Sequence, residues 1–222
     1  MIKAVFFDIN ETILRLDSIK GAFEKYGKDT TFLKYWFTKL LKTSMVMGSQ
    51  DNYLNFDKMA EFVLEDVFKE AGEDLKKEDK KILLDSFKSM DPFDDVAESL
   101  RILKDSNLKV LAVSNSSESM IKQQLTHAGI FNYFDNYYSV EAVKKNKPFK
   151  DIYLYASEEE GLDPSEVMMV ASHDWDLYGA KSVGMKTAYI DRKQSVFYPC
   201  YPKPDLEDDS LVLLVKKIVI FQ

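Results

Sequence analysis

The chain alternates short apolar runs with amphipathic segments along most of its length. Apolar runs without polar alternation are typical of strands that are buried on both faces of a parallel sheet. Four runs have this character: Ile2–Phe7, Leu108–Val113, Val167–Ala171 and Lys186–Ile190. Segments with helical spacing lie between or after them: Val96–Ser106, Ser119–Ala128, Phe149–Glu160 and Asp176–Val183. Strands and helices in alternation, with short connections, predict an α/β fold with a doubly wound (Rossmann-like) parallel sheet.

The region that follows the first strand has a different pattern. It contains no strand-like run and four amphipathic helical candidates: Ser18–Tyr26, Thr31–Val46, Phe56–Ala71 and Lys77–Met90. The dipeptide Asp91-Pro92 ends it, because a residue before proline disfavours helix. We therefore predict a core domain of residues 1–16 and 92–222, with a helical cap domain of residues 17–91 inserted after the first strand. Such an insertion overhangs the carboxyl edge of the sheet, where ligands bind in open α/β folds.

Composition and charge restrict the class of protein. The 222 residues are 45% hydrophobic and 30% charged, which is typical of a globular protein rather than a disordered one. The 30 basic and 37 acidic residues give a formal net charge of −7, which argues against a nucleic-acid partner. A single cysteine excludes an internal disulfide, and two histidines exclude a His-rich zinc site.

The sequence also bears on the location of the protein. No apolar stretch approaches the roughly 20 residues that span a bilayer, and the polar residues from Asp8 onward do not fit a signal peptide. We therefore expect a cytoplasmic protein with no membrane partner. Gln194–Asp209 contains prolines and is predicted only as a surface excursion. Arginine occurs at three positions, which are Arg15, Arg101 and Arg192.

Polar side chains gather where the predicted strands end. They are Asp8 and Thr12 after the first strand, Ser114, Asn115 and Ser116 after the second, and His173, Asp174 and Asp176 after Val167–Ala171. Lys147 lies between the last two groups, ahead of a proline and a helix. Each group alone is more typical of a helix cap or a solvated loop than of a catalytic site. Their joint occurrence, in this order at successive strand ends, favours an active site instead.

These groups, in this order, resemble the four motifs of the haloacid dehalogenase superfamily of hydrolases. The resemblance covers the whole chain, insertion included, and within the superfamily the chain is most similar to the (S)-2-haloacid dehalogenases. The stretch YFDNYYSVEAVKKNKPFKDIYLYA resembles the segment around the lysine of that branch, and WDLYGAKSVGMKTAYIDR resembles its last motif. The resemblance implies a hydrolase that works through a covalent aspartyl ester.

The resemblance also implies roles for individual residues. Asp8 is the expected nucleophile, and Lys147 favours the charged form of its carboxylate. Asp176 is expected to position Lys147 and the water that hydrolyses the ester. Further residues are implied to hold Asp8 or the substrate's carboxylate, or to line the site: Thr12, Ser114, Asn115 and Tyr153. We take Asp8, Lys147, Asp176, Thr12 and Ser114 as catalytic candidates and the others as substrate-binding candidates.

Asn10 separates the two main chemistries of the superfamily. Its phosphatases have a second aspartate two residues after the nucleophile, because an alkoxide leaving group needs a proton from a general acid. Asn10 has no acidic proton to give, whereas a halide leaves without protonation. Asn10 therefore favours dehalogenation, although the dehalogenases usually have tyrosine at this position.

A magnesium site is the second discriminator. Mg²⁺ takes oxygen ligands, and a phosphatase of this type would offer Asp8, Asp174 and Asp176. The Gly-Asp pattern of the phosphatases is absent, and Val170-Ala171-Ser172 stands there instead. We therefore expect no metal and no cofactor, with Mg²⁺ as the cofactor only in the phosphatase alternative.

The chain departs from the dehalogenases around the expected halide site. Phe37, which follows Trp36, stands where the family has an arginine that helps to receive the halide. Ala171 and His173 stand where the family has serine and asparagine. Trp175 keeps the aromatic residue of the halide site. His173 has two interpretations, as a compensating cation or water-orienting group and as the cap of a turn.

We predict hydrolysis of a small (S)-2-haloacid to the 2-hydroxy acid through an aspartyl ester. The first alternative is a Mg²⁺-dependent phosphatase that acts on a small phosphoester. The second is a protein of the same fold that has lost turnover and serves as a binding protein. The expected partner is a small anionic molecule, and an exposed apolar surface on the insertion would fit a homodimer.

Overall fold

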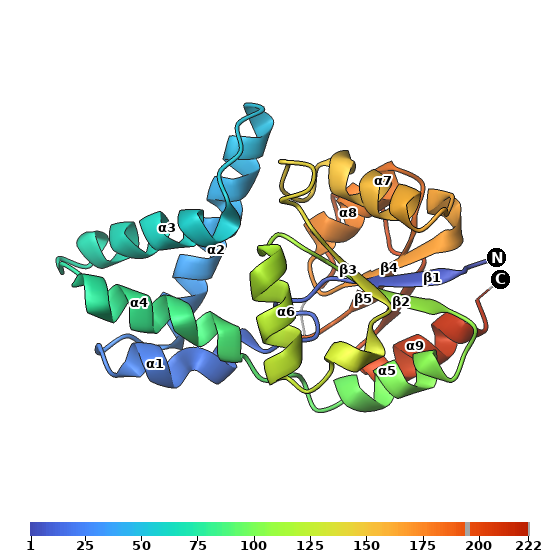
Figure 1. Cartoon of the computed structure of the whole chain (residues 1–222), viewed down its shortest axis with the longest axis horizontal. Helices are drawn as coiled ribbons and strands as arrows, with labels where there is room; N and C mark the ends of the chain where they lie inside the picture. The colour runs from blue at the N-terminus through green and yellow to red at the C-terminus, as the bar shows by residue number, and fades with distance from the viewer. Residues whose placement is uncertain (194–195, 222) are drawn as a thin grey trace.

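The computed structural model describes residues 1–193 and 196–221, and helices cover both faces of a six-stranded parallel sheet in it (Figure 1). The strand order is β3-β2-β1-β4-β5-β6. The strands are β1 (Ala4–Phe7), β2 (Lys109–Ser114), β3 (Asn136–Ser139), β4 (Val167–Ala171), β5 (Lys186–Ile190) and β6 (Leu206–Asp208). The predicted α/β fold with a doubly wound parallel sheet is therefore confirmed. Among the described residues, no helix is long and apolar enough to cross a membrane.

Two strands are additions to the prediction. β3 has the sequence NYYS and is only half-buried, so it lacks the apolar run that identifies a central strand. β6 is a three-residue strand that pairs with β5 at the edge of the sheet. It lies within Gln194–Asp209, which was predicted only as a surface excursion, and its residues are partly or fully exposed. Residues 194 and 195 of that segment lie outside the described residues.

Each inner strand buries side chains on both faces. Val5 and Phe7 point to the face that is covered by α5 (Val96–Lys104), α6 (Glu118–His127) and α9 (Leu211–Val219). Ala4 and Phe6 point to the opposite face, which is covered by α7 (Lys150–Glu159) and α8 (Asp174–Ser182). This burial explains why the strands read as continuous apolar runs. Helix α9 was not among the predicted elements.

The insertion is helical throughout its described elements and lies to one side of the sheet (Figure 1). Its elements are η1 (Leu16–Ile19), α1 (Lys20–Glu24), α2 (Thr30–Ser49), α3 (Phe56–Glu70), α4 (Lys77–Ser86) and η2 (Phe87–Ser89). Polar caps fix two helix starts, because Asp29 accepts from the Phe32 N–H and Asn55 accepts from the Asp57 N–H. The division into two domains at residues 16/17 and 91/92 stays a prediction.

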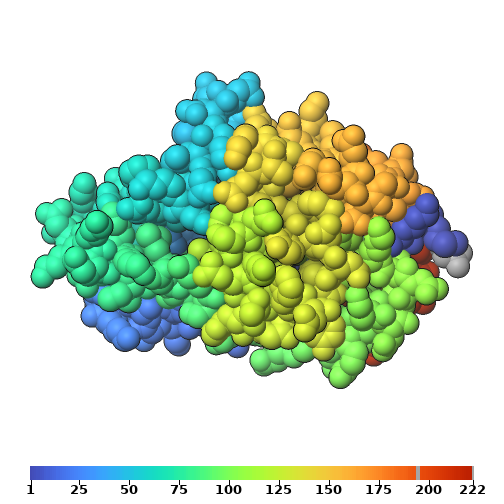
Figure 2. Space-filling view, in the orientation of Figure 1, coloured from blue at the N-terminus to red at the C-terminus, as the bar shows by residue number. Residues whose placement is uncertain are grey.

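The insertion and the sheet share apolar packing and polar contacts. One cluster of buried apolar residues includes Trp36 and Leu64 of the insertion together with Val5 of the sheet. At the far end of α2, Gly48 lies so close to Phe149 that a methyl group there would be 2.3 Å from the ring. Figure 2 shows this end of α2 (cyan) against the segment that precedes α7 (yellow). The helical region is therefore packed against the carboxyl edge of the sheet.

The topology brings three loops together at that edge. β1 lies between β2 and β4, and Phe7 is in register with Ala112 on one side and Val170 on the other. The residues that follow these three strands therefore meet at one point. In a doubly wound sheet this reversal of strand order is where a ligand binds.

Candidate active site

Asp8 lies directly after β1 and is held by its backbone and its side chain. Its N–H donates to the Val170 carbonyl at 3.0 Å, which fixes it against β4. Its carboxylate accepts from the Thr12 hydroxyl, with 2.7 Å between Oδ2 and Oγ1. Thr12 is held in turn, because its Oγ1 accepts from the Ser172 N–H at 3.0 Å. Asp8 is only 6% exposed, so its reactive oxygens have little solvent around them.

Lys147 is the cation beside Asp8. It comes from the loop before α7, and its Nζ lies 3.1 Å from Asp8 Oδ1 and 2.8 Å from Asp176 Oδ2. Its side chain is 1% exposed, so both ion pairs are shielded from water. The Lys147 N–H donates to Asn115 Oδ1 at 2.8 Å, which ties this loop to the loop after β2. One buried ammonium therefore joins two carboxylates from opposite sides of the site.

Electrostatics keep this cluster charged. Burial alone would raise the pKa of Asp8, but Lys147, His173 and the Thr12 hydroxyl outweigh it and hold that pKa well below its usual range. Burial works to lower the pKa of Lys147, yet the carboxylates of Asp176 and Asp8 raise it. Burial raises the pKa of Asp176, which already shares Lys147 with Asp8. Asp8 is thus an ionised carboxylate in a water-poor site, which is the form that attacks an electrophile.

Tyr153 and Gly179 complete the support behind Lys147. The Tyr153 hydroxyl donates to Asp176 Oδ1 at 2.5 Å, so it orients that carboxylate toward Lys147. Helix α8 approaches the lysine loop closely at Gly179. A methyl group at Gly179 would lie 2.4 Å from the Pro148 carbonyl oxygen and 2.8 Å from the Tyr153 hydroxyl. A residue without a side chain is therefore needed at this position.

Three predicted residues hold loops instead of contacting Asp8. The Ser114 hydroxyl accepts from the Ser116 N–H, and Asn115 accepts from the lysine loop as described. Asn10 donates from Nδ2 to Ser116 Oγ and accepts at Oδ1 from Gln124, both at 3.2 Å. Asn10 is 6% exposed, so its amide is occupied in a buried network. Contacts of Ser114, Asn115 and Asn10 with a substrate stay predictions.

His173 joins Asp8 to Glu11, a residue that the sequence analysis missed. His173 Nδ1 lies 3.4 Å from Asp8 Oδ2, and Nε2 lies 2.9 Å from Glu11 Oε2. The ring also packs on Trp175, with 5.1 Å between centroids. Burial lowers the pKa of His173, but the two carboxylates outweigh it and raise it to about 9. Glu11 was overlooked because a charged residue in a turn has no distinctive pattern.

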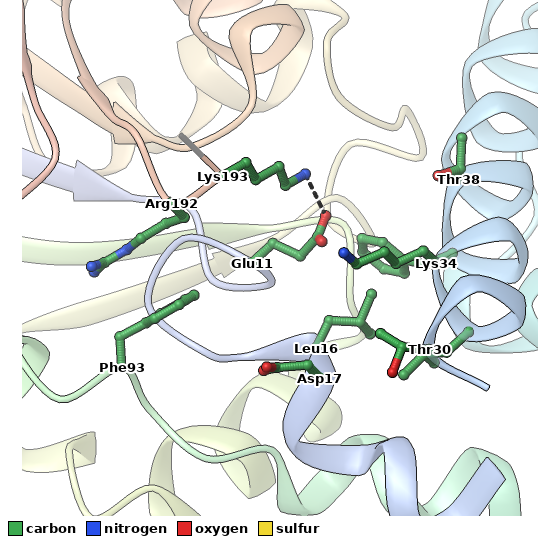
Figure 3. Close-up of a pocket in the computed structure, with 11 residues that line it drawn as sticks. Glu11, Leu16, Asp17, Thr30, Lys34, Thr38, Phe93, Arg192 and Lys193 are labelled. Atoms are coloured by element: carbon green, nitrogen blue, oxygen red, sulfur yellow. Dashed lines mark hydrogen bonds and ion pairs between the residues drawn. The ribbon is translucent and has the colours of Figure 1, made fainter. Parts of the chain in front are cut away.

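Two cavities lie between α2 and the core, on either side of Glu11. The first has a volume of about 410 Å³, and Figure 3 shows Lys34 extending from α2 toward Glu11 across it. The second, of about 460 Å³, is lined by His173 and Trp175. Glu11 and Lys193 line both cavities, and their ion pair of 3.1 Å stands between them.

Neither Phe37 nor Arg15 or Arg192 places a cation beside Asp8. Phe37 lines the first cavity but is only 2% exposed, because its ring packs on Phe87 at 5.9 Å. Arg15 pairs with Asp17 instead of Asp8. Arg192 donates from Nε to the Thr12 carbonyl at 3.0 Å, and so supports the turn that carries the nucleophile. The cation that faces the cavity from α2 is thus Lys34, one turn before Phe37.

A magnesium site does not fit the residues present. Asp174 uses Oδ1 to accept from the Trp175 N–H at 2.7 Å, while Asp8 and Asp176 share the ammonium of Lys147. Among the described residues, no group of three or more His, Cys, Asp or Glu side chains is placed to hold a metal ion. The set Asp8, Asp174 and Asp176 that a phosphatase would need is therefore not assembled.

Comparison with known proteins agrees with this geometry. Residues 2–184 match the haloacid dehalogenase-like hydrolase family. The (S)-2-haloacid dehalogenase of Pseudomonas sp. (strain YL) is 33% identical over 219 residues, which cover 97% of this chain and 94% of that protein. That of Pseudomonas fluorescens is 28% identical over 205 residues, or 91% and 90% of the two chains.

A solved structure extends the likeness to three dimensions. The L-2-haloacid dehalogenase of Xanthobacter autotrophicus has a TM-score of 0.92 and 25% identity, with all of both chains covered. The helical insertion is included in that coverage, as it is in the two sequence matches. Fold, arrangement of the polar groups and sequence thus agree, and the chain belongs to the haloacid dehalogenase-like hydrolase family.

Proposed function

We propose that the protein hydrolyses small (S)-2-haloacids to 2-hydroxy acids, with Asp8 as the nucleophile. The observation that carries this proposal is the ionised Asp8 carboxylate paired with Lys147, beside an amide at residue 10 where a proton donor would be needed for an alkoxide. The relatives named (S)-2-haloacid dehalogenase support the same chemistry.

The reaction has two steps. An Asp8 oxygen attacks C2 of the haloacid, the carbon–halogen bond breaks, and the halide leaves with the electron pair. Attack from the side opposite the halide inverts the configuration at C2. Water then adds to Cγ of the Asp8 ester, and cleavage of the Cγ–O bond releases the 2-hydroxy acid and regenerates the carboxylate. Lys147, at 3.1 Å from Oδ1, stabilises the oxyanion that forms on this group.

The proposal includes a reaction that needs no metal or cofactor. A halide leaves without a proton and without a Lewis acid, and Lys147 already supplies the positive charge beside Asp8. For the substrate's carboxylate, Lys34 of α2 lines the first cavity and supplies positive charge. The apolar side chains of Leu16, Phe37 and Phe93 also line this cavity, which suits the alkyl part of a small haloacid.

Halide release from (S)-2-chloropropionate is the direct test. We expect turnover with the wild-type protein, none with Asp8→Asn, slower or no turnover of the (R) enantiomer, and no loss of rate in a chelator. Hydrolysis of p-nitrophenyl phosphate with added Mg²⁺ is the comparison assay. Phosphate release that requires Mg²⁺, together with no halide from several haloacids, would overturn the proposal.

A labelling experiment tests the covalent step. In a single turnover in heavy-oxygen water, the product takes its new oxygen from Asp8, so the first product is unlabelled and the label enters the Asp8 peptide. Label that appears directly in the first product contradicts the ester.

A cytoplasmic location and a homodimer stay predictions, and light scattering of the purified protein tests the second.

A further inference from the structure

Glu11 has a backbone conformation that favours glycine, and yet it carries a carboxylate. Glu11 lies three residues after the nucleophile, and its φ of 62° is in the left-handed region. Its side chain is 13% exposed and is held by His173 at 2.9 Å and Lys193 at 3.1 Å. A strained position is retained when the surroundings fix it, and such positions cluster at functional sites. The carboxylate of Glu11 therefore calls for an explanation.

The imidazole of His173 is fixed between two carboxylates. It is 7% exposed, its Nε2 faces Glu11, and its Nδ1 faces the Asp8 oxygen that accepts from Thr12. Trp175 packs against the ring from the following turn. The ring is thus oriented with one nitrogen toward the atoms of the proposed ester, and the opposite nitrogen is held by Glu11.

We propose that His173, oriented by Glu11, takes the proton from the water that hydrolyses the Asp8 ester. This inference rests on the proposed function, because it assigns a residue to the second step of that reaction. His173 is the catalytic residue, since Nδ1 lies beside the reacting group. Glu11 acts through His173 and is a positioning residue.

The charges around His173 change as the reaction proceeds. The charged groups that face it or its cavity are Asp8 and Glu11 from the turn after β1, Lys193, Lys42 of α2 and Asp174 of its own helix, with Lys147 and Asp176 behind Asp8. In the free enzyme, Asp8 and Glu11 together hold the imidazole protonated. Esterification removes the charge of Asp8, one of the two carboxylates that raise the pKa of His173, so the buried ring gives up its proton more readily. The first step therefore prepares the base for the second.

His173 carries one proton from the water to the leaving group in this step. Water adds to Cγ of the ester as one of its protons passes to His173 Nδ1, and the tetrahedral intermediate carries its negative charge beside Lys147. The Cγ–O bond then breaks, and His173 returns the proton to the alkoxide oxygen of the departing hydroxy acid. The proton that remains on Asp8 then passes to His173, which had given up its own proton to solvent after the first step, so Asp8 and His173 both return to their charged forms.

The first test separates the two steps by rapid quenching and intact-mass measurement after mixing with (S)-2-chloropropionate. We expect His173→Gln to release about one halide per protein in a burst and to hydrolyse the ester about 100-fold more slowly, so that the adduct accumulates. His127→Gln, at the other and exposed histidine, is the matched control and should leave both steps unchanged. Ester hydrolysis at the wild-type rate in His173→Gln overturns the proposal.

The second test asks whether Glu11 acts through its carboxylate or through the backbone. Glu11→Gly relieves the strained backbone, whereas Glu11→Gln keeps the strain and the shape of the side chain. If Glu11 has only a structural role, the two variants should therefore change the rate of ester hydrolysis in different directions. We expect both to slow ester hydrolysis about 10-fold, while Glu11→Gly is at least as stable as wild type. An unchanged rate of ester hydrolysis in either variant overturns the positioning role.

A third readout needs no substrate. Titration of the imidazole by NMR should give a proton affinity of His173 about 10-fold lower in Glu11→Gln than in wild type. An unchanged affinity overturns the contact between the two residues. If the wild-type protein forms no adduct with any haloacid, the proposed function fails and the proton-transfer step fails with it. The NMR result stands independently, so the two failures are distinguishable.

Discussion

The candidate site contains two groups of side chains, and they differ in how the sequence specifies them. The first, called here the nucleophile cluster, consists of Asp8, Thr12, Lys147, Tyr153 and Asp176. The second, called here the cleft-facing cluster, consists of Glu11, Lys34, Phe37, His173 and Lys193. The nucleophile cluster matches the motifs of the resembled family, and its contacts are short and shielded from water. The cleft-facing cluster departs from the family at Phe37 and His173.

We relate this difference to the two tasks of the site, with the nucleophile cluster for the chemical step and the cleft-facing cluster for substrate recognition. Displacement by a carboxylate needs a charged nucleophile, and the buried chain of Asp8, Lys147 and Asp176 keeps the nucleophile charged. The wall that faces the substrate has to fit only its shape and charge, so several side chains serve. We propose Lys34, on α2 beside Phe37, as one such side chain.

The largest effect is expected in the nucleophile cluster. Lys147→Met removes the ammonium that the buried carboxylates of Asp8 and Asp176 share, which favours the uptake of a proton by one of them. We expect kcat/KM for (S)-2-chloropropionate to fall about 100- to 1,000-fold. Because Lys147 lowers the pKa of Asp8, the acid limb of the pH profile should also move to higher pH in the variant.

Lys150→Met is the matched control for that experiment, because Lys150 is an exposed lysine at the start of α7. It should change the rate less than about twofold, as is usual for a surface position. Equal rates for the two variants, or an acid limb that stays in place in Lys147→Met, would show that Asp8 keeps its charge without the lysine.

An intermediate effect is expected where α8 packs against the lysine loop. In Gly179→Ala the added methyl group would overlap the Pro148 carbonyl and the Tyr153 hydroxyl, so the loop or the helix must move. We expect a loss of about 1–3 kcal/mol in the free energy of unfolding, measured in urea, and a lower kcat.

Gly21→Ala makes the same chemical change in α1, where nothing lies within 4 Å of the added carbon. It should leave stability unchanged or raise it by up to about 1 kcal/mol, because alanine favours helix over glycine. If the two glycine variants behave alike, close packing behind Lys147 does not hold the nucleophile cluster in place.

The smallest effect is expected on the cleft-facing side. Lys34 is exposed and extends into the first cavity, so water and salt screen its attraction for a substrate's carboxylate (Figure 3). In Lys34→Met we expect KM to rise about two- to fivefold with little change in kcat. The increase should shrink as the salt concentration rises.

Lys39→Met serves as the matched control, since Lys39 belongs to the same helix but pairs with Asp66 and Glu70 of α3. Its KM should equal that of the wild type. A similar KM in the Lys34 and Lys39 variants would mean that α2 contributes no cation to recognition.

The fold was predictable where buried elements leave a pattern of apolar residues in the sequence. The strands β4 and β5 begin and end where their apolar runs predict, because both faces of these strands are covered. β3 and β6 were not predicted, because a short, half-exposed strand at the edge of a sheet needs no apolar run. Such strands are specified by their pairing partners, and pairing leaves no local signal.

The site was predictable where its residues follow predicted strands, as Asp8 and Asp176 do, and the role of Lys147 came from the resemblance. Glu11 could not be found this way, because its importance comes from the place of His173, which lies 162 residues further along the chain. Ser114 and Asn115 were placed in the correct loops, yet the sequence does not tell which neighbour each amide or hydroxyl binds. The local sequence pattern predicts that a residue lies near the site. Which partner its side chain contacts depends on the three-dimensional structure.

The apolar cluster shared by the helical region and the sheet has a consequence for how the protein unfolds. Trp36 and Leu64 belong to the same buried cluster as Val5 and Leu103, so the two parts share one apolar core on this face of the sheet. Loss of either part exposes apolar surface on the other, which makes a half-unfolded state unfavourable. We therefore expect heat to melt the helices over the site and the sheet beneath them in one cooperative transition.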